Sequence, residues 1–297
     1  MAAVRWRALA PGKVNLCLFL GPTRADGRHE LVTVFESVSL ADELELVARN
    51  EGADEVICPG VEGPNLVSAA LAGLRARGWE GPPVCVRVSK WIPVAGGMGG
   101  GSADAAATIR LAQALSGIDG HAARELAVDL GADVPSQLEP GVALGTGAGE
   151  IVAPAAALGE HTFVIVPLAV ELSTAAVFAR ADELGLPRGG EELAGRLAAV
   201  TRALQEGGRW PSELVVNDLE PAARDLCPQI GGAVEAARRA GADDAFVSGS
   251  GPTVVAVFWG RRARERADDA EVTLAGRYPE AYAADPVSAA FGAPQRA

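Results

Sequence analysis

The chain has 297 residues, of which 49% are hydrophobic and 22% are charged. This much apolar material can bury a sizeable core, which excludes disorder as the main state, and the length suits one large or two modest domains. The net charge of −12 opposes binding to a phosphate backbone, so we expect no nucleic-acid partner.

Other classes of protein are also excluded by the sequence. No run of roughly 18 apolar residues lacks charges, so we expect no transmembrane helix. Lys13 and Asn15 interrupt the apolar core that a signal peptide would need. The four cysteines are scattered without a CxxC pair, which predicts reduced thiols and no zinc site or disulfide framework. We therefore expect a cytoplasmic protein with no membrane partner.

Residues 1–60 are predicted to be rich in strands, and the following residues add helices. Apolar or alternating runs indicate the strands, and Asn65 is a candidate N-cap for the first helix. In chain order the predicted elements are strands over 14–20, 31–35 and 43–47, a helix over 65–77, a strand over 84–88, and helices over 102–115 and 121–130.

The pattern changes near residues 154–159, which are typical of a linker between two halves. The elements predicted beyond it are a strand over 163–166, helices over 174–184, 191–205 and 221–240, strands over 245–248 and 254–258, and a helix over 261–275. Residues 288–297 are predicted to be a frayed tail. Strands and helices mixed in this way predict two α+β domains, residues 1–155 and 156–297.

The strongest chemical signal is the glycine-rich segment Pro93–Ala106. Five of the six residues from Gly96 to Gly101 are glycine, and glycine lets a ligand approach the backbone closely. The segment leads into an Ala-rich helix, whose first-turn N–H groups and dipole favour an anion. The Walker pattern GxxxxGK[ST] and the dinucleotide pattern GxGxxG are both absent. A flexible linker is the alternative, but linkers do not lie between a strand and a capped helix, so the pattern predicts phosphate binding.

Three weaker signals also have ordinary structural explanations. Lys13 and Asn15 alternate with apolar residues and project from one face of a strand, as in a solvated sheet edge. Asp133 follows a glycine-terminated helix, where an aspartate commonly caps a turn, although a carboxylate on a constrained turn also suits proton transfer. The Ser248–Gly251 turn is either a simple hairpin or a contact for phosphate or hydroxyl groups.

The order of these segments is more specific than any one of them. A Pro-x-Gly-Lys-x-Asn strand, the glycine-rich loop and a late Ser-Gly-Ser-Gly-Pro turn together resemble the GHMP kinase superfamily of small-molecule kinases. Further segments resemble the branch whose acceptor carries a cytidine diphosphate: Arg24–Leu31, Gly99–Gly101, Gly131–Pro135, Gly145–Glu150 and Asn217–Pro221. The likeness runs from about residue 8 to about residue 260.

This resemblance implies an α+β, two-domain GHMP kinase fold, with a ribosomal-protein-S5-like N-terminal domain and a ferredoxin-like C-terminal domain. It implies ATP-dependent phosphorylation of the 2-hydroxyl of 4-diphosphocytidyl-2-C-methyl-D-erythritol, a step of the non-mevalonate isoprenoid pathway. ATP and Mg²⁺ are the implied cofactors. The enzyme would be a monomer or a homodimer.

The resemblance also implies a role for individual residues. Asp133 would be the catalytic base and Lys13 the cation paired with it. The residues that would bind ATP are Pro93, Gly96, Gly97, Gly99, Gly100, Gly101 and Ser102. The residues that would bind the acceptor are Asn15, Arg28, His29, Thr174 and Phe178, with His29 bonded to the cytosine and Phe178 stacked on it. The phosphate-contacting turn would be Ser248, Gly249, Ser250 and Gly251, and no metal ligand is assigned.

Two departures from the family pattern leave alternatives open. Arg28 stands where the family has a tyrosine that stacks on cytosine, and a planar guanidinium can stack in its place. Ala103 stands where the family has a second serine, which removes a potential contact to phosphate or magnesium. The alternatives are a GHMP kinase for another sugar alcohol or secondary metabolite, and a nucleotide-binding protein without activity, against which the retained Asp133 argues.

Overall fold

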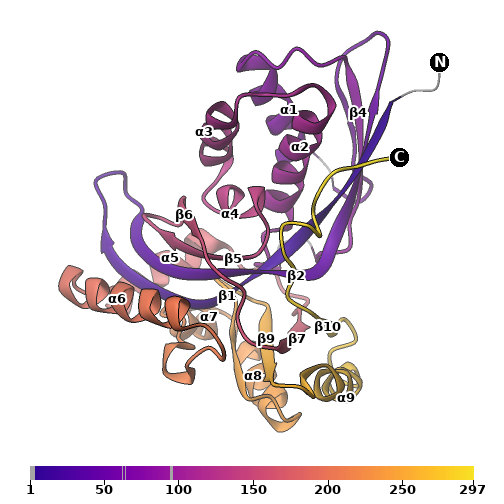
Figure 1. Cartoon of the computed structure of the whole chain (residues 1–297). Coiled ribbons are helices and arrows are strands. Elements are labelled where there is room, and N and C mark those ends of the chain that lie inside the picture. The colour runs from indigo at the N-terminus through magenta and orange to yellow at the C-terminus, as the bar shows by residue number, and fades with distance from the viewer. Residues whose placement is uncertain (1–3, 62, 64, 94–95) are drawn as a thin grey trace.

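The structure is a computed structural model that describes residues 4–61, 63, 65–93 and 96–297. Within these residues the chain forms a seven-stranded sheet and a four-stranded sheet that pack against each other, with helices on their other faces (Figure 1). This is the α+β arrangement that the sequence predicts. None of the helices among these residues combines the length and the apolar character needed to cross a membrane.

The seven-stranded sheet is built mainly by the first half of the chain. Its strands are β1 (Arg5–Thr23), β2 (His29–Ala48), β3 (Glu55–Ile57), β4 (Val84–Ser89), β5 (Val142–Thr146), β6 (Ile151–Pro154) and β11 (Gln295–Arg296). One half of β2 pairs with β4 and the other half with β5, so the sheet bends along its two longest strands. Four helices lie on one face of this sheet: α1 (Leu66–Ala76), α2 (Gly100–Ser116), α3 (Gly120–Leu130) and α4 (Val134–Leu138).

The hydrophobic patterns of β1 and β2 reflect which faces of these strands are covered by other elements. In the segment 43–47 of β2, charged and apolar residues alternate because one face of the sheet is open to solvent. In β1 the residues from Ala10 to Gly21 are all buried, because helices and the second sheet cover this part from opposite sides. A continuous apolar run is the expected sequence of a strand that is covered on both faces.

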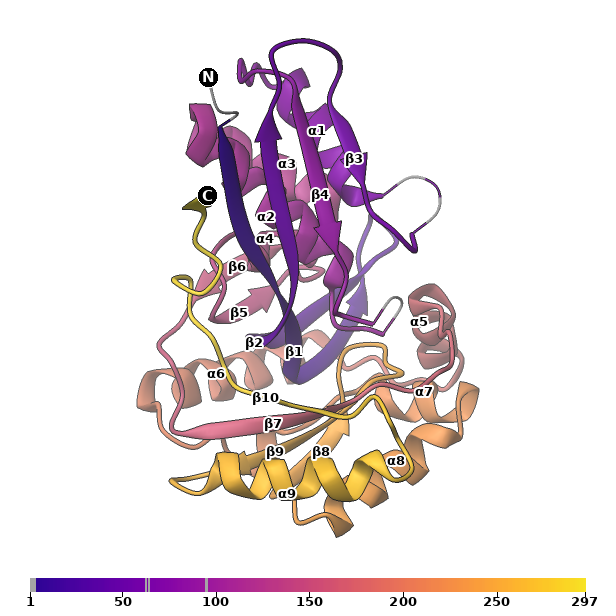
Figure 2. The same cartoon turned by 90° about the vertical axis from the view of Figure 1, so that its right-hand side faces the viewer.

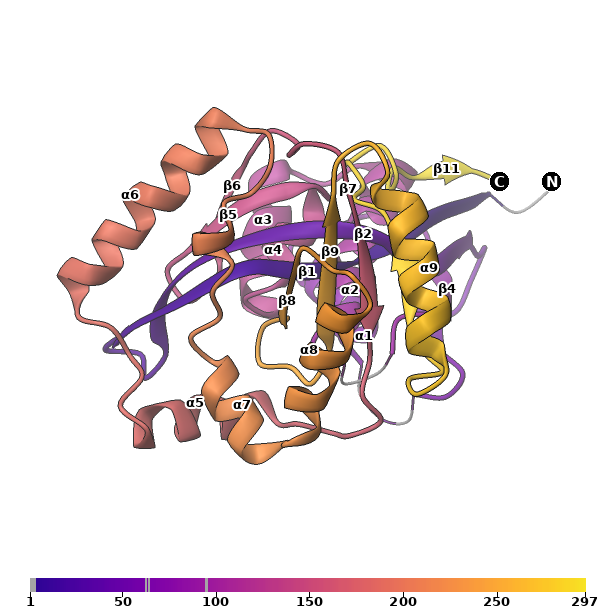
Figure 3. The ribbon, with the colours of Figure 1, turned by 90° about the horizontal axis from the view of Figure 1, so that it is seen from below.

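The four-stranded sheet is antiparallel in the order β10–β7–β9–β8 (Figure 2). Its strands are β7 (His161–Val166), β8 (Asp244–Val247), β9 (Val254–Trp259) and β10 (Tyr282–Ala284). The remaining helices are α5 (Thr174–Glu183), α6 (Gly190–Glu206), the short 3₁₀ turn η1 (Ser212–Leu214), α7 (Glu220–Leu226), α8 (Gln229–Arg239) and α9 (Ala263–Ala275). Figure 3 shows α8 and α9 on the outer face of this sheet and α6 beside β1 and β2.

Strand β9 shows how the two layers are joined. Val254, Ala256 and Phe258 point to the helices on the outer face, where they join one hydrophobic cluster. Val255 and Val257 point to the opposite face and pack with β1 and β2 in a second cluster. Each fully buried side chain of this kind contributes about 1.5–3 kcal/mol, so the sheets are held together by a continuous core rather than by a hinge.

Several predicted elements differ in the structure. The strands predicted over 31–35 and 43–47 are parts of the single strand β2. The helix predicted over 221–240 is broken between α7 and α8, because Pro228 cannot continue the hydrogen bonding of α7 and starts a new helix as its N-cap. The tail predicted to fray over 288–297 is ordered, because β11 pairs with β1 and Arg110 donates a hydrogen bond to the carbonyl of Gly292. The chain end therefore belongs to the first sheet, although it lies beyond the domain boundary predicted at residues 155 and 156. That boundary stays a prediction.

Candidate active site

The glycine-rich loop closes around a cavity of about 340 Å³ at the start of α2. Gly97 and Gly99 have φ values of +73° and +68°, which residues with a side chain rarely adopt. Gly99 is the N-cap of α2, and no side chain accepts hydrogen bonds from the first turn among the described residues. The first N–H groups of the helix are therefore free to bind a group in the cavity. Every predicted ATP-binding residue lines this cavity: Pro93, Gly96, Gly97, Gly99, Gly100, Gly101 and Ser102.

A buried charged cluster lies behind this loop, and the sequence analysis did not identify it. Lys90 Nζ lies 2.7 Å from Asp104 Oδ2 and also donates to Asp42. Asp42 accepts the backbone N–H groups of Trp91 and Ile92 at 2.6 and 2.8 Å. Burial, opposed by the charge of Lys90, raises the pKa of Asp104 to about 7. Lys90 and Asp104 both line the cavity, so the cluster fixes the strand and helix that carry the loop.

Lys13 and Asn15 do project from one face of β1, as the period of a strand predicts. Lys13 Nζ donates to Asn15 Oδ1 at 2.7 Å and lies 3.4 Å from Asp133 Oδ2. The Lys13 side chain is only 5% exposed, whereas that of Asp133 is 37% exposed. Asp133 starts the short helix α4, but within the described residues its side chain makes no capping hydrogen bond. The carboxylate is therefore turned to the lysine and to open space rather than to its own helix.

These residues border a second cavity of about 360 Å³. Its lining includes Lys13, Asn15 and Asp133 together with Thr174, Phe178, Gly249 and Ser250. Gly97, Gly99 and Ser102 line both cavities. The two cavities therefore share a wall of glycine-rich backbone, with the Lys13–Asp133 pair on the side of the second one.

The Ser248–Gly251 turn closes the second cavity from the four-stranded sheet. Ser250 Oγ lies 2.9 Å from Thr174 Oγ1. Ser248 is fully buried, and its Oγ accepts the backbone N–H of Asn15 at 3.2 Å, so it joins the two sheets. The side chain of Asn217 donates to the carbonyls of Val247 and Gly249 and so shapes the turn. Asn217 lies in a segment to which the sequence analysis assigned no role.

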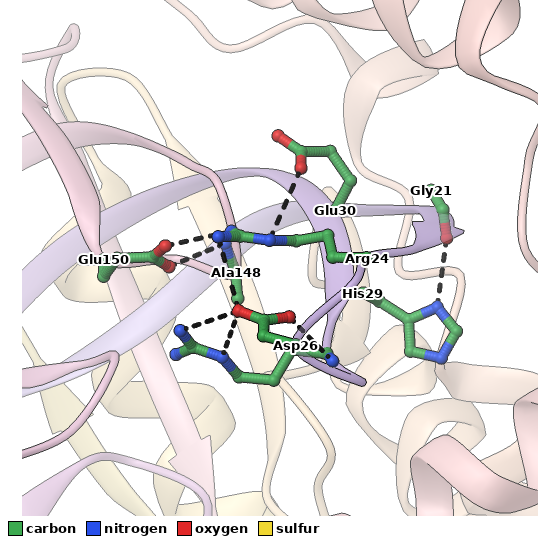
Figure 4. Close-up of polar contacts among 8 residues, drawn as sticks. Gly21, Arg24, Asp26, His29, Glu30, Ala148 and Glu150 are labelled. Carbon is green, nitrogen blue, oxygen red and sulfur yellow. Dashed lines mark hydrogen bonds and ion pairs between the residues drawn. The ribbon is translucent and has the colours of Figure 1, made fainter.

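His29 and Arg28 lie differently from the other predicted acceptor residues. His29 is buried, with one ring nitrogen 3.1 Å from the carbonyl of Gly21 (Figure 4). Its other ring nitrogen lies 3.2 Å from Asp182 Oδ2. Its ring stacks on Phe178 at 5.7 Å between centroids. Arg28 is exposed and bonds to Asp26 on the same turn. Neither residue is among the described residues that line the second cavity, although His29 supports one that does.

Several walls of the second cavity were not predicted from the sequence. Thr33 and Phe35 on β2 line it together with Ala148 and Gly149 of the turn between β5 and β6. Asn15 lies opposite Phe35 in the β1–β2 register and donates to Thr33 Oγ1 at 2.8 Å. The pairing of β2 with β5 joins segments more than 100 residues apart, and no local pattern in the sequence indicates such a pairing.

Comparison with known proteins places the chain in a family. Residues 65–141 match the GHMP kinases N terminal domain, and residues 191–271 match the GHMP kinases C terminal model. A 4-diphosphocytidyl-2-C-methyl-D-erythritol kinase of Kineococcus radiotolerans is 43% identical over 83% of this chain and 79% of its own length. The protein of that name from Streptomyces coelicolor is 40% identical over 89% of this chain and 91% of its own length.

Solved structures agree with this placement. The crystal structure of a 4-(cytidine 5'-diphospho)-2C-methyl-D-erythritol kinase has a TM-score of 0.75 and 31% identity, and the match covers 94% of this chain and 98% of that one. A homoserine kinase from Cytophaga hutchinsonii has a TM-score of 0.65 at 17% identity and shares the fold. The chain belongs to the GHMP kinases, and within them to the family of the 4-diphosphocytidyl-2-C-methyl-D-erythritol kinases.

Proposed function

We propose that the protein transfers the γ-phosphoryl group of ATP to the 2-hydroxyl of 4-diphosphocytidyl-2-C-methyl-D-erythritol. The observation that carries the proposal is the common wall of the two cavities, formed by Gly97, Gly99 and Ser102. Phosphoryl transfer requires mainly that donor and acceptor are positioned and that developing charge is neutralised. Adjacent cavities with an ionic pair beside their common wall supply both requirements.

The two side chains at the wall have complementary tasks in this proposal. Asp133 accepts the proton of the acceptor hydroxyl as its oxygen bonds to the γ-phosphorus, and the bond from that phosphorus to the bridging oxygen of ADP breaks. Lys13, 3.4 Å from Asp133 and bonded to Asn15, carries a positive charge beside the developing negative charge of the acceptor oxygen. Because Lys13 is buried, its charge is poorly screened by water.

The nucleotide side relies on backbone groups. The N–H groups of Gly100, Gly101 and Ser102 begin α2, and the positive end of the helix dipole points in the same direction. The loop also packs closely on the catalytic pair, since a Cβ on Gly99 would lie 3.2 Å from Lys13 Cε. We infer that the triphosphate lies along this segment, with its γ-phosphate near the common wall.

Magnesium is expected to arrive with the nucleotide. Among the described residues no group of three or more His, Cys, Asp or Glu side chains is placed to hold a metal ion. Magnesium commonly keeps several waters and is bound by one or two carboxylates together with substrate phosphates, so a preformed protein cage is not required. When bound, it would neutralise phosphate charge, and no residue of this chain is assigned to it.

The decisive test is the release of ADP from ATP with 4-diphosphocytidyl-2-C-methyl-D-erythritol as the acceptor. The wild-type protein should turn over, and Asp133→Asn should lower kcat by about 100-fold or more with little change in ATP affinity, because an amide cannot take the proton. Asp129→Asn is the matched control, since Asp129 is an exposed carboxylate on α3 that pairs with Arg77. Its kcat should equal that of the wild type.

Two results would contradict the proposal. No turnover by wild-type protein that still binds ATP would favour a different sugar alcohol as acceptor, the alternative that the exposed position of Arg28 leaves open. Near-normal kcat in Asp133→Asn would remove Asp133 from the role of base.

A further inference from the structure

Two charged residues that have no role in the proposed reaction meet beside the second cavity. Arg24 lies in the turn between β1 and β2, and Glu150 lies in the turn between β5 and β6. Arg24 Nη1 donates to Glu150 Oε1 at 2.9 Å (Figure 4). The two turns are neighbours because β2 pairs with β5, and the N–H of Leu31 donates to the carbonyl of Gly147 at 2.6 Å.

The carboxylate of Glu150 is used on both of its oxygens. While Oε1 accepts from Arg24, Oε2 accepts the backbone N–H of Ala148 at 2.6 Å (Figure 4). The Glu150 side chain is only 11% exposed. Burial raises its pKa, but hydrogen bonds from backbone N–H groups and from Arg24 outweigh this and hold the pKa below its usual value. Glu150 is therefore an anion at neutral pH.

The backbone of the turn fits closely around this pair. Gly147 has a φ of +68°, and a Cβ there would lie 2.9 Å from Glu150 Oε1 and 3.1 Å from Arg24 Nη1. Gly149 has a φ of +104°. The turn therefore has a conformation that glycine allows, and the ion pair occupies the space that a side chain on Gly147 would take.

The same turn forms part of the second cavity. Ala148 and Gly149 line it beside Thr33 and Phe35, whereas Arg24 and Glu150 are outside the described lining. On the opposite side, the backbone N–H of Arg24 donates to the carbonyl of Arg28 at 2.6 Å and closes the turn that leads to His29. One ion pair thus connects the turn that carries His29 to the turn that forms the cavity wall.

We propose that Arg24 and Glu150 are positioning residues for the acceptor, because their ion pair fixes the Ala148–Gly149 wall of the second cavity. This inference rests on the proposed function. Arg24 is well suited to the task, since its guanidinium also lies 3.4 Å from Asp26 and 4.0 Å from Glu30. A fork of several N–H donors can hold such a group of carboxylates, and the single ammonium of a lysine cannot reproduce it.

The test compares Arg24→Ala, Arg24→Lys, Glu150→Gln and the double variant Arg24→Ala/Glu150→Gln in the ADP-release assay. KM for the acceptor should rise about tenfold in Arg24→Ala and in Glu150→Gln. KM for ATP should stay within about twofold of the wild-type value, because Ala148 and Gly149 are not in the described lining of the first cavity. The double variant should be no worse than Arg24→Ala, since both changes remove the same contact. Arg24→Lys should recover only part of the loss.

The control pair is Arg49 and Glu55, an exposed ion pair with a 2.8 Å contact, and neither residue is in the described lining of either cavity. Arg49→Ala should leave both KM values unchanged. A lower melting temperature of Arg24→Ala with an unchanged acceptor KM would show a purely structural role and overturn the inference. Equal rises of both KM values, or additive effects in the double variant, would overturn it as well.

Failure of the inference and failure of the proposed function give different results. If the wild-type protein turns over the cytidine-diphosphate acceptor and the variants keep the wild-type KM for it, only the positioning role is wrong. If the wild-type protein does not turn over this acceptor, the proposed function and the inference that rests on it are both overturned.

Discussion

The close approach of Gly97 to the Ser248–Gly251 turn allows a quantitative prediction for Gly97→Ala. A Cβ at this position would lie 2.6 Å from the carbonyl oxygen of Gly251 and 3.3 Å from that of Ser248. Both neighbours are backbone atoms, which cannot rotate away as the end of a long side chain can. The φ of +73° adds a second cost, because a residue with a Cβ is strained in the left-handed region.

These two costs can be estimated separately. The left-handed conformation costs about 1–2 kcal/mol, and inserting a methyl group into a packed contact costs about 1–3 kcal/mol. We expect Gly97→Ala to lower the free energy of unfolding by about 2–5 kcal/mol. Gly185→Ala is the matched control, since Gly185 has a φ of +67° and within the described residues no atom lies within 4 Å of the place that a Cβ would take. It should lose only the conformational part, about 1–2 kcal/mol.

The assay is urea unfolding followed by tryptophan fluorescence, combined with initial rates at varied ATP and acceptor. If the glycine-rich loop shifts rather than the Ser248–Gly251 turn, the loss of stability will be smaller, and KM for ATP will rise because the shifted N–H groups no longer match the phosphates. The reasoning is refuted if Gly97→Ala equals Gly185→Ala in unfolding free energy and also keeps the wild-type KM for ATP.

Two further predictions concern the region where the halves of the chain meet. His161 Nε2 lies 3.1 Å from Glu36 Oε2 with both groups buried, and although burial lowers the pKa of His161, Glu36 raises it above its usual value. The stability that this pair contributes is therefore fully present below the unfolded pKa of about 6.5, and it is lost as the pH rises through the folded pKa. The melting temperatures of the wild type and His161→Gln should differ more at pH 5.5 than at pH 9. An equal difference at the two pH values would contradict this. Deleting residues 288–297 should lower the unfolding free energy by about 1–3 kcal/mol. The deletion removes the Gly292 carbonyl that accepts a hydrogen bond from Arg110, whose guanidinium has a pKa that burial lowers to about 10. If the tail were frayed, denaturant titration would show no loss of stability.

The parts of the site that the sequence predicts are those with a local signal. The period of two along a strand puts Lys13 beside Asn15, and the glycine-rich loop before α2 marks an anion site through backbone chemistry alone. Asn65 accepts the N–H of Ser68 at 2.9 Å and caps α1 as expected. Each of these features depends on a few consecutive residues, so neither topology nor packing is needed to predict it.

The parts that were missed depend on pairing across long stretches of chain. Thr33 lines the second cavity with Ala148 only because β2 pairs with β5. The helix break has a local signal, since Pro228 ends α7 and starts α8, and the single helix predicted over 221–240 did not take it into account. Arg28, predicted to bind the acceptor, bonds instead to its own turn, because Asp26 accepts hydrogen bonds from both its backbone N–H and its guanidinium.

The two cavities differ in the kind of atoms that form them, and this bears on how substrates can diverge in the superfamily. One wall of the first cavity is glycine backbone, from Gly96 to Gly101 around Met98, and this wall depends on φ values and on the start of α2. The second cavity is lined largely by side chains from β1, β2 and α5, by the residues just before α4, and by the two turns. Substitutions there change shape and hydrogen bonding without disturbing the loop. A homoserine kinase shares this fold at 17% identity, and we expect residues such as those at the Ala148–Gly149 wall to select the acceptor in this chain.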